Sequence, residues 1–127
     1  MAPKVGMIQD QFQPLSKTPN CRSSMADPQN STYYVAPLTY SGSRDSARSK
    51  LMDVLKALPL THLIKAEEQY LYYQCRTKVF KFTDDVEFYF PAEEGVIHMR
   101  SASRIGYNDW GTNLRRLEGI RAAFERA

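Results

Sequence analysis

The sequence predicts a single α+β domain in which two helices pack on one face of an antiparallel β-sheet, in the order β-α-β-β-β-β-α. Two segments, 44–58 and 112–126, carry apolar residues at helical spacing. The segments between them alternate apolar and polar residues, which is typical of strands with one buried face. The 127 residues suffice for one ordinary core without metal or disulfide staples.

The first strand is predicted over residues 32–40, which are rich in Tyr, Val and Thr. Pro37 indicates an edge position, because proline cannot donate to a strand ladder. Residues 41–43 break the strand pattern, and Pro59 ends the helix that follows over 44–58. The apolar stripe of that helix comprises Ala47, Leu51, Val54, Leu55 and Leu58.

Three or four strands follow the first helix. A short strand over 63–66 precedes a turn at 67–69, and longer strands are predicted over 70–79, 84–90 and 96–103. Their alternation leaves the opposite face of the sheet polar and partly open. The residues predicted to face the core are Leu71, Tyr73, Cys75, Val79, Val86, Phe88, Phe90, Ile97 and Met99.

The last two strands are predicted to pair as a hairpin within residues 84–103, across a four-residue loop at 92–95. Gly95 can take a positive φ at the end of this loop. The predicted register places Glu87 opposite Arg100. A slip of one residue would turn the apolar set of one strand to water, so odd slips are excluded.

The last helix is predicted over residues 112–126. Trp110 lies one turn earlier on the line of the apolar residues, so it is expected to close the helix start as a hydrophobic staple. The buried stripe comprises Leu114, Leu117, Ile120, Ala123 and Phe124.

The N-terminal segment 1–18 is predicted to be a flexible arm, and residues 19–127 are predicted to be the folded domain. The arm shows no sustained period and is rich in polar residues and proline. Cys75 is expected on the core face of a strand, whereas nothing in the pattern fixes the position of Cys21. These two thiols are therefore not expected to bond to each other. The arm's apolar residues, which can lie in a surface groove, are Val5, Met7, Ile8, Phe12 and Leu15.

The composition excludes several classes of protein. The net charge is only +3, and acidic and basic residues are interspersed from Asp45 onward, which does not favour nucleic-acid binding. No run approaches the roughly 20 apolar residues of a membrane span. No apolar segment of signal-peptide length precedes Asp10. These features favour a cytoplasmic location for the chain as given.

The densest polar segment joins the last strand to the last helix. Backbone N–H groups at a helix start attract anions, and two arginines stand nearby, so one interpretation is an anion-binding corner. The alternative is a satisfied polar corner, in which Asp109 or Asn113 caps the helix and the arginines pair with carboxylates. The candidate ligand-binding residues are Arg100, Ser101, Ser103, Arg104, Asp109 and Asn113.

Three carboxylates, Asp84, Asp85 and Glu87, fall within four residues. A metal site is not expected, because strand alternation points Asp84 away from the other two. Ion pairs with Arg100 and Arg104 are favoured instead. Because Glu87 would hold Arg100, Arg104 is the better candidate for binding an anion. No cofactor is predicted.

Catalytic motifs are scarce. The two histidines, His62 and His98, lie at a strand start and on the polar sheet face. Cys21 lies beside Arg22, which can lower a thiol pKa, but no base is evident. Neither a Gly-x-Ser-x-Gly elbow nor a glycine-rich phosphate loop occurs in the sequence.

Four blocks together resemble one known family. They are residues 19–24, the strand with Tyr70, Arg76 and Thr77, residues 82–88, and residues 100–106 continued through Asp109, Gly111, Asn113, Arg116 and Glu118. On these blocks, from Pro19 to its end, the chain resembles the family catalogued as domain of unknown function 1499 (DUF1499). The sequence departs from the usual family residue at Cys75, Asn108, Trp110 and Leu114. The resemblance implies no function, and many family members carry a membrane segment or targeting peptide before the domain.

The leading hypothesis is a non-catalytic binding or assembly module, which recognises a partner protein or a small anionic ligand through the polar sheet face and the corner at 100–113. The alternative is a small hydrolase or transferase that uses this corner as its anion-binding active site. A concave pocket with a strongly perturbed carboxylate or histidine would favour the enzyme. A flat open face would favour the binding module.

Overall fold

The computed structural model describes residues 4–92, 95–106 and 108–127. From the fourth strand onward, the elements follow the predicted order β-α-β-β-β-β-α. The elements are β1 (Met7–Ile8), β2 (Gln11–Phe12), β3 (Cys21–Ser23), β4 (Leu38–Thr39), α1 (Arg44–Lys56), β5 (Thr61–Ala66), β6 (Tyr70–Arg76), β7 (Thr83–Tyr89), β8 (Val96–Ser103) and α2 (Thr112–Arg126).

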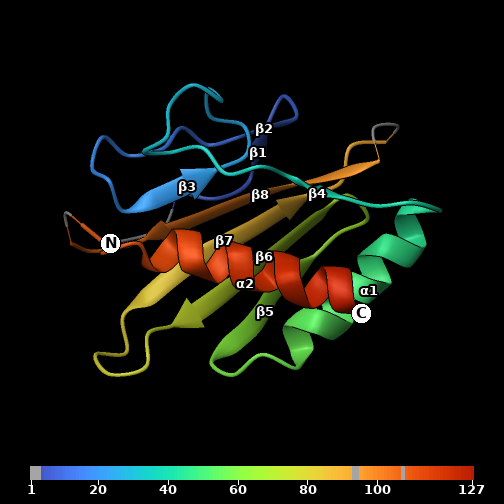
Figure 1. Ribbon diagram of the computed structural model, residues 1–127. Coiled ribbons are helices and arrows are strands. Elements are labelled where there is room, and N and C mark those ends of the chain that lie inside the picture. Colours follow the sequence, from blue (N-terminus) through green and yellow to red (C-terminus); the bar gives the residue numbers. More distant parts are fainter. Residues whose placement is uncertain (1–3, 93–94, 107) are drawn as a thin grey trace.

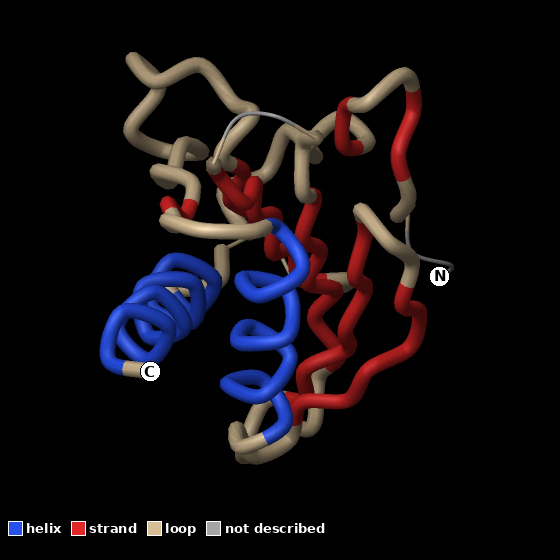
Figure 2. The backbone as a smooth tube through the Cα atoms, turned by 90° about the vertical axis from the view of Figure 1, so that its right-hand side faces the viewer, coloured by secondary structure: helices blue, strands red, loops and turns tan. Residues whose placement is uncertain are grey.

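The main sheet has the strand order β3-β8-β7-β6-β5, and β4 pairs with the start of β8. Every one of these pairings is antiparallel. Both helices cover the same face of the sheet, and the β1–β2 hairpin lies on the other side (Figure 1; Figure 2). The predicted α+β class and the two-helix layer are confirmed.

The hydrophobic core lies between the sheet and the two helices. All but one of the strand residues predicted to face the core lie in it, the exception being Val79. The rings of Tyr73 and Phe88 meet edge to face with their centroids 6.0 Å apart. Burial of each large apolar side chain stabilises the fold by about 1.5–3 kcal/mol. The fully buried members include Leu51, Leu55, Leu71, Val86, Phe88, Phe90, Ile97, Met99 and Leu117.

The hairpin of β7 and β8 has the predicted register. Glu87 lies opposite Arg100, and Tyr89 lies opposite His98. Gly95 takes the expected positive φ of 63°. Glu93 and Glu94 of the predicted loop lie outside the described residues.

The predicted first strand over 32–40 is wrong in its extent, because only Leu38–Thr39 forms a strand. The reason lies in β8, along which pairing is divided between two segments: β3 pairs with residues 100–102, and β4 pairs with Val96 and Ile97. Tyr34 forms only an isolated parallel bridge to Ser23.

Two predicted apolar contacts are also wrong. Val79 is 78% exposed, because β6 ends at Arg76 and the chain then turns. Trp110 is 80% exposed rather than a staple. Gly111, with φ 80°, turns the chain just before α2, and Arg115 in the first turn donates from Nη1 to the Trp110 carbonyl at 2.8 Å. The staple position on the helix is therefore occupied by a polar contact.

The outer face of the sheet is polar and partly open, as expected: β5 is exposed, whereas the face of β6, β7 and β8 is largely covered. Residues 4–18 run over this face, on the side away from the helices (Figure 2). The Gly6 N–H donates to Glu87 Oε2 at 2.8 Å, and the Pro14 carbonyl accepts from Arg100 Nη2 at 3.3 Å. The arm therefore contributes polar partners to groups that would otherwise face water.

Both cysteines are free and buried. Cys21 lies in β3, where it pairs with Ala102, so its position is fixed by the sheet. Cys75 lies in β6, three strands away in the order β3-β8-β7-β6. Three strand spacings amount to roughly 14 Å, about twice the Cα separation that a disulfide can bridge.

A chain that begins at Pro19 tests the predicted boundary between the arm and the domain. We expect this chain to fold, because both helices and the main sheet lie beyond the boundary. Its free energy of unfolding should fall by about 2–4 kcal/mol, since Phe12 no longer packs and Glu87 loses its contact with Gly6. Urea denaturation followed by circular dichroism measures the difference. Equal stability would show that the arm adds nothing, and an unfolded product would refute the boundary.

Candidate functional site

Strand alternation divides the predicted corner between the two faces of the sheet. Arg100 and Arg104 contact Glu87 and Asp85 on the outer face. The other four candidates meet on the helix face. Ligand binding by any of these six candidate residues stays a prediction. The four that the structure brings together are Ser101, Ser103, Asp109 and Asn113.

Glu87 and Arg100 form a buried ion pair on the outer face, with Nη1 3.1 Å from Oε1. Glu87 is fully buried and also accepts from the Tyr70 hydroxyl at 2.6 Å and from the Gly6 N–H. Burial raises the pKa of Glu87, although the donors on Tyr70, Gly6 and Arg100 oppose the shift. Burial and the neighbouring carboxylate of Glu87 also raise the pKa of Tyr70.

Arg104 forms a two-pronged contact with Asp85, in which Nε and Nη2 each lie 3.0 Å from a carboxylate oxygen. The Tyr72 hydroxyl donates to the same carboxylate. The pKa of Tyr72 is raised mainly by burial and secondly by this hydrogen bond to Asp85. Bidentate contacts of this kind are among the strongest charge-assisted hydrogen bonds. Asp85 therefore engages Nε and Nη2 of Arg104, and another anion would have to bind through the remaining N–H groups of the guanidinium.

Asn113 is the centre of the polar cluster on the helix face. Its side chain is fully buried and uses both its oxygen and its nitrogen as hydrogen-bond groups. The cluster is therefore satisfied from within, as a polar corner requires. Its partners are Ser101 Oγ at 2.6 Å, Arg116 Nη1 at 2.9 Å, Ser103 Oγ at 2.9 Å, Asp109 Oδ2 at 2.8 Å and the Asn20 carbonyl at 2.9 Å.

Asp109 supplies the negative charge that the start of α2 attracts. Its two oxygens accept from the N–H of Gly111 at 2.9 Å and the N–H of Asn113 at 3.1 Å. Burial alone would raise the pKa of Asp109, but the Asn113 side chain and these two backbone N–H groups outweigh it and lower the pKa. The helix start is thus already occupied by a carboxylate of the same chain.

An ion pair between Asp84 and Arg116 was not predicted from the sequence. Arg116 Nη2 lies 2.8 Å from Asp84 Oδ2, and the two side chains are 15% and 2% exposed. The sequence does hold a signal for it, because alternation places Asp84 on the same face as Val86 and Phe88. A carboxylate on an apolar face requires a cation from the element that covers it.

A cleft of about 840 Å³ opens beside this ion pair. It is framed by residues 58–60, the β6–β7 hairpin at 76–82, the loop before α2, and α2 itself. Its volume lies in the range of about 300–1,000 Å³ typical of small-molecule sites. Most of the wall is apolar, and the apolar residues are Leu58, Pro59, Leu60, Val79, Phe80, Phe82, Ile105, Trp110 and Ile120.

Beside its apolar wall, the cleft lining includes polar side chains and a thiol. Asp84 lines it together with Arg116, Cys75 and Ser103. Burial raises the pKa of the Asp84 carboxyl, and Arg116 opposes this shift. Burial also raises the pKa of the Cys75 thiol, whose Sγ lies 3.7 Å from Thr61 Oγ1. This thiol is therefore held in its protonated form.

The mouth of the cleft is basic. The lining includes four basic residues but only two acidic ones, Asp84 and Asp109, and both acids are already engaged as described above. Of the basic residues, Arg76, Lys78 and Arg115 are exposed and have no carboxylate partner in the part of the chain that the structure describes. An anionic group at the mouth would meet uncompensated positive charge.

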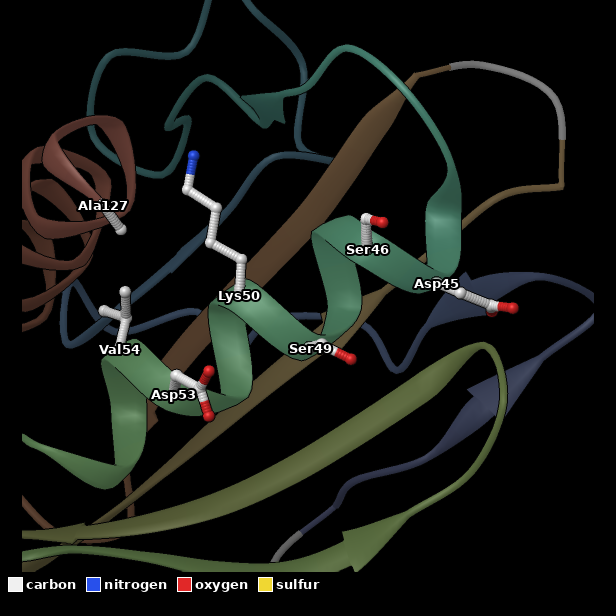
Figure 3. A pocket seen from close by; sticks show the side chains of 7 residues that line it. All are labelled: Asp45, Ser46, Ser49, Lys50, Asp53, Val54 and Ala127. Carbon is white, nitrogen blue, oxygen red and sulfur yellow. The ribbon is translucent and has the colours of Figure 1, made fainter.

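A second groove lies between α1 and the C-terminal end of α2 (Figure 3). All seven of its lining residues are exposed or half-buried, and Asp45, Ser49 and Asp53 are spread along one helix rather than converging. Lys50 Nζ already lies 4.4 Å from the centre of the Phe124 ring, a cation–π contact. This groove therefore lacks a set of converging polar groups, and we assign no site to it.

Among the described residues, no three His, Cys, Asp or Glu side chains group closely enough to hold a metal ion. In the same residues, no helix has both the length and the apolar character needed to cross a membrane.

The fold and the cleft define a two-layer α+β domain with an amphipathic cleft at one end of its sheet. The chain belongs to the DUF1499 family, described as protein of unknown function, whose sequence profile matches residues 11–124 of the 127. The resemblance found in the sequence is thereby confirmed. Comparisons with curated proteins and with solved structures give no significant match.

Replacement of Asn113 tests the polar cluster on the helix face. Asn113→Ala removes the shared partner of Ser101, Ser103 and Asp109, so the free energy of unfolding should fall by about 2–4 kcal/mol. Thermal and urea unfolding measure the loss. Thr112→Ala, one residue earlier in the same helix turn, is the control and should cost far less. Equal losses of unfolding free energy in the two variants would show that the cluster does not stabilise the fold more than Thr112 does.

The raised pKa of Glu87 predicts a pH dependence of stability. The folded protein keeps the Glu87 proton at pH values where the unfolded chain, with a usual glutamate pKa of 4.5, has lost it. The Glu87 contribution to the free energy of unfolding is therefore full below pH 4.5 and is lost as the pH rises through the folded-state pKa.

Glu87→Gln cannot titrate at this position. Relative to this variant, the wild-type protein should lose stability as the pH rises from about 4.5 towards 7. Urea midpoints measured across this range give the difference. Glu125→Gln, on the exposed surface, controls for the loss of one carboxylate. A wild-type advantage that grows with pH would contradict the prediction.

Proposed function

We propose that this domain is a non-catalytic binding module that holds an amphiphile, a small molecule with an apolar chain and an anionic headgroup. The observation that carries the proposal is the cleft, which combines a mostly apolar wall with a basic mouth. An apolar chain would gain by leaving water along the wall, at about 0.8 kcal/mol for each buried methylene. The headgroup would stay at the mouth, near Arg76, Lys78 and Arg115.

The charge at the mouth supports an anionic headgroup over a neutral or cationic one. The acids of the lining are neutralised inside the protein, Asp84 by Arg116 and Asp109 by the start of α2. The basic side chains at the mouth have no such compensation. In a partly enclosed cleft, unlike charges attract more strongly than in open water.

A second candidate is the small hydrolase or transferase, and one observation favours it. Asp84 has a raised pKa and lines a concave cleft, a combination that is typical of catalytic carboxyls. Against this role, Asp84 is fixed by its 2.8 Å ion pair with Arg116. The Cys75 thiol is protonated, and the Ser103 hydroxyl already accepts from Asn113. The geometry therefore favours binding over turnover.

Three probes separate the two halves of the proposed ligand. Decanoate has both chain and charge, decan-1-ol has the chain alone, and acetate has the charge alone. We expect decanoate, kept below its micelle concentration, to raise the melting temperature most, decan-1-ol less, and acetate not at all beyond its effect as a salt. Titration calorimetry then gives the affinity for decanoate.

Gly119 provides a matched pair of variants. It lies in α2 and lines the cleft, and an added Cβ would meet no atom within 4 Å. Gly119→Leu fills cleft space and should weaken decanoate binding at least tenfold, without destabilising the helix. Gly119→Ala makes the same change in helix propensity without the bulk and should bind as the wild type does.

Equal binding of decanoate and acetate, or binding that survives Gly119→Leu, would refute the binding site. The ester p-nitrophenyl decanoate tests the second candidate, since a binding module should not hydrolyse it above the rate in buffer. Turnover that Asp84→Asn abolishes while decanoate binding persists would establish the enzyme instead.

A further inference from the structure

We propose that the two loops at the mouth of this cleft dock the domain on an anionic lipid bilayer, from which the cleft takes up its amphiphile. The loops are the β6–β7 hairpin at 76–82 and the segment before α2 that includes Ile105 and Trp110. Uptake rests on the proposed function, whereas docking rests on these two loops alone.

The loops expose an unusual concentration of large apolar side chains. Val79 is 78% exposed and Phe80 is 72% exposed at the tip of the hairpin. Across the cleft, Ile105 is 53% exposed and Trp110 is 80% exposed. All four line the same cleft, so they gather at one end of the molecule. Single exposed apolar residues are ordinary on soluble proteins, but a group of this kind marks an interaction surface.

The hairpin tip is held in place by its own hydrogen bonds. The N–H of Thr77 donates to the Phe82 carbonyl at 2.8 Å, the N–H of Phe82 donates to Thr77 Oγ1 at 2.8 Å, and the N–H of Lys81 donates to the Thr77 carbonyl at 3.1 Å. The Phe80 and Phe82 rings stack with centroids 5.4 Å apart. The backbone therefore presents these side chains outward instead of letting them fold back onto the core.

The charge of the hairpin fits an anionic surface. Residues 76–82 include Arg76, Lys78 and Lys81 and no acidic residue. The turn at the other end of β6, residues 67–69, contains Glu67 and Glu68 instead. Basic side chains close to an anionic leaflet each strengthen attachment about fivefold. The hairpin thus combines positive charge with exposed apolar side chains at the same end of the molecule.

The order of residues favours a bilayer over a protein partner. Lys78, Val79, Phe80, Lys81 and Phe82 mix basic and apolar side chains within one tight loop. A dry protein interface would have to bury both ammonium groups, which is costly without partners. At a membrane surface, aromatic rings lie at the headgroup level while lysine side chains reach back to the phosphates.

Docking in this way would place the cleft mouth at the membrane surface. Phe80 and Trp110 come from the two different loops that line the cleft. With both side chains among the lipid headgroups, an acyl chain could pass from the bilayer along the apolar wall without crossing water. Arg76 and Lys78, which belong both to the hairpin and to the cleft lining, would then meet the headgroup of the bound amphiphile.

Trp110 allows a direct test, because it is the single tryptophan of the chain. The full-length protein is mixed with vesicles of phosphatidylcholine alone or of phosphatidylcholine with phosphatidylglycerol. On the anionic vesicles we expect the Trp110 emission to shift to shorter wavelength and to be quenched by lipids brominated on the acyl chain. Pure phosphatidylcholine should give little of either effect, and added salt should weaken the binding.

Two double variants test the loop. Val79→Ser with Phe80→Ser should reduce vesicle binding at least tenfold, and Lys78→Glu with Lys81→Glu should do so at least twentyfold, since about fivefold is lost for each lysine. Leu63→Ser with Ile64→Ser is the matched apolar control, because these side chains are 44% and 50% exposed on β5, away from the cleft. Lys65→Glu is the charge control. Both controls should bind vesicles as the wild type does.

The two proposals fail separately. Gly119→Leu should lose decanoate but keep the Trp110 shift on vesicles, because Gly119 lies outside both loops. If decanoate binds but anionic vesicles do not, docking is wrong and the binding cleft stands. If vesicles bind but decanoate does not, docking stands and the ligand proposal is wrong. Sedimentation without lipid that shows a dimer abolished by Val79→Ser with Phe80→Ser would mean that a second copy covers the loops, which overturns docking.

Discussion

The ion pair between Asp84 and Arg116 fixes α2 against the sheet, and the shape of the cleft depends on it. Arg116 reaches Asp84 on β7 with one nitrogen and Ser101 and Asn113 with another. Removing two charges from water costs several kcal/mol for each, so such a pair adds little net stability. Loss of one partner, however, strands the other charge and costs about 3–5 kcal/mol. The pair therefore acts mainly by selecting one position of the helix, and that position sets the width of the cleft beside it.

Strand β7 also carries two carboxylates on the outer face of the sheet, and these explain why the N-terminal arm lies over that face. Asp85 and Glu87 point away from the helices and bind Arg104 and Arg100. These groups would be only partly dehydrated on an open sheet face, where an ion pair contributes little. The arm at Gly6 donates directly to Glu87 and completes its set of donors. One strand thus joins the helix layer on one side and the arm on the other through alternating carboxylates.

Periodic patterns in the sequence predicted the parts of the structure that repeat, and non-periodic contacts were missed. The helix stripes and the pairing of Glu87 with Arg100 followed from spacing alone, because burial penalises every slip of one residue. The strand β3 is only three residues long and is defined by its pairing with β8, so no local period marks it. Trp110 was misplaced for a related reason, since a left-handed turn at Gly111 outweighed its apolar character. Most of the cleft comes from loops, and for that reason the sequence predicted a polar corner but no cavity.

Backbone strain gives an independent reason to place function at the cleft. In the described part of the chain, five residues other than glycine have a positive φ: Gln9, Asp10, Leu60, Lys81 and Trp110. The first two form the turn between β1 and β2, where a positive φ is the usual geometry of a two-residue hairpin. The other three lie one in each of the three loops that frame the cleft. Each such conformation costs on the order of 1–3 kcal/mol and persists only where the surroundings impose it. A fold that needed these loops merely as connections would gain stability by replacing each strained residue with glycine or asparagine. The occurrence of three such conformations around one cavity supports the proposal that these loops are shaped for a ligand as well as for connecting the helices and strands.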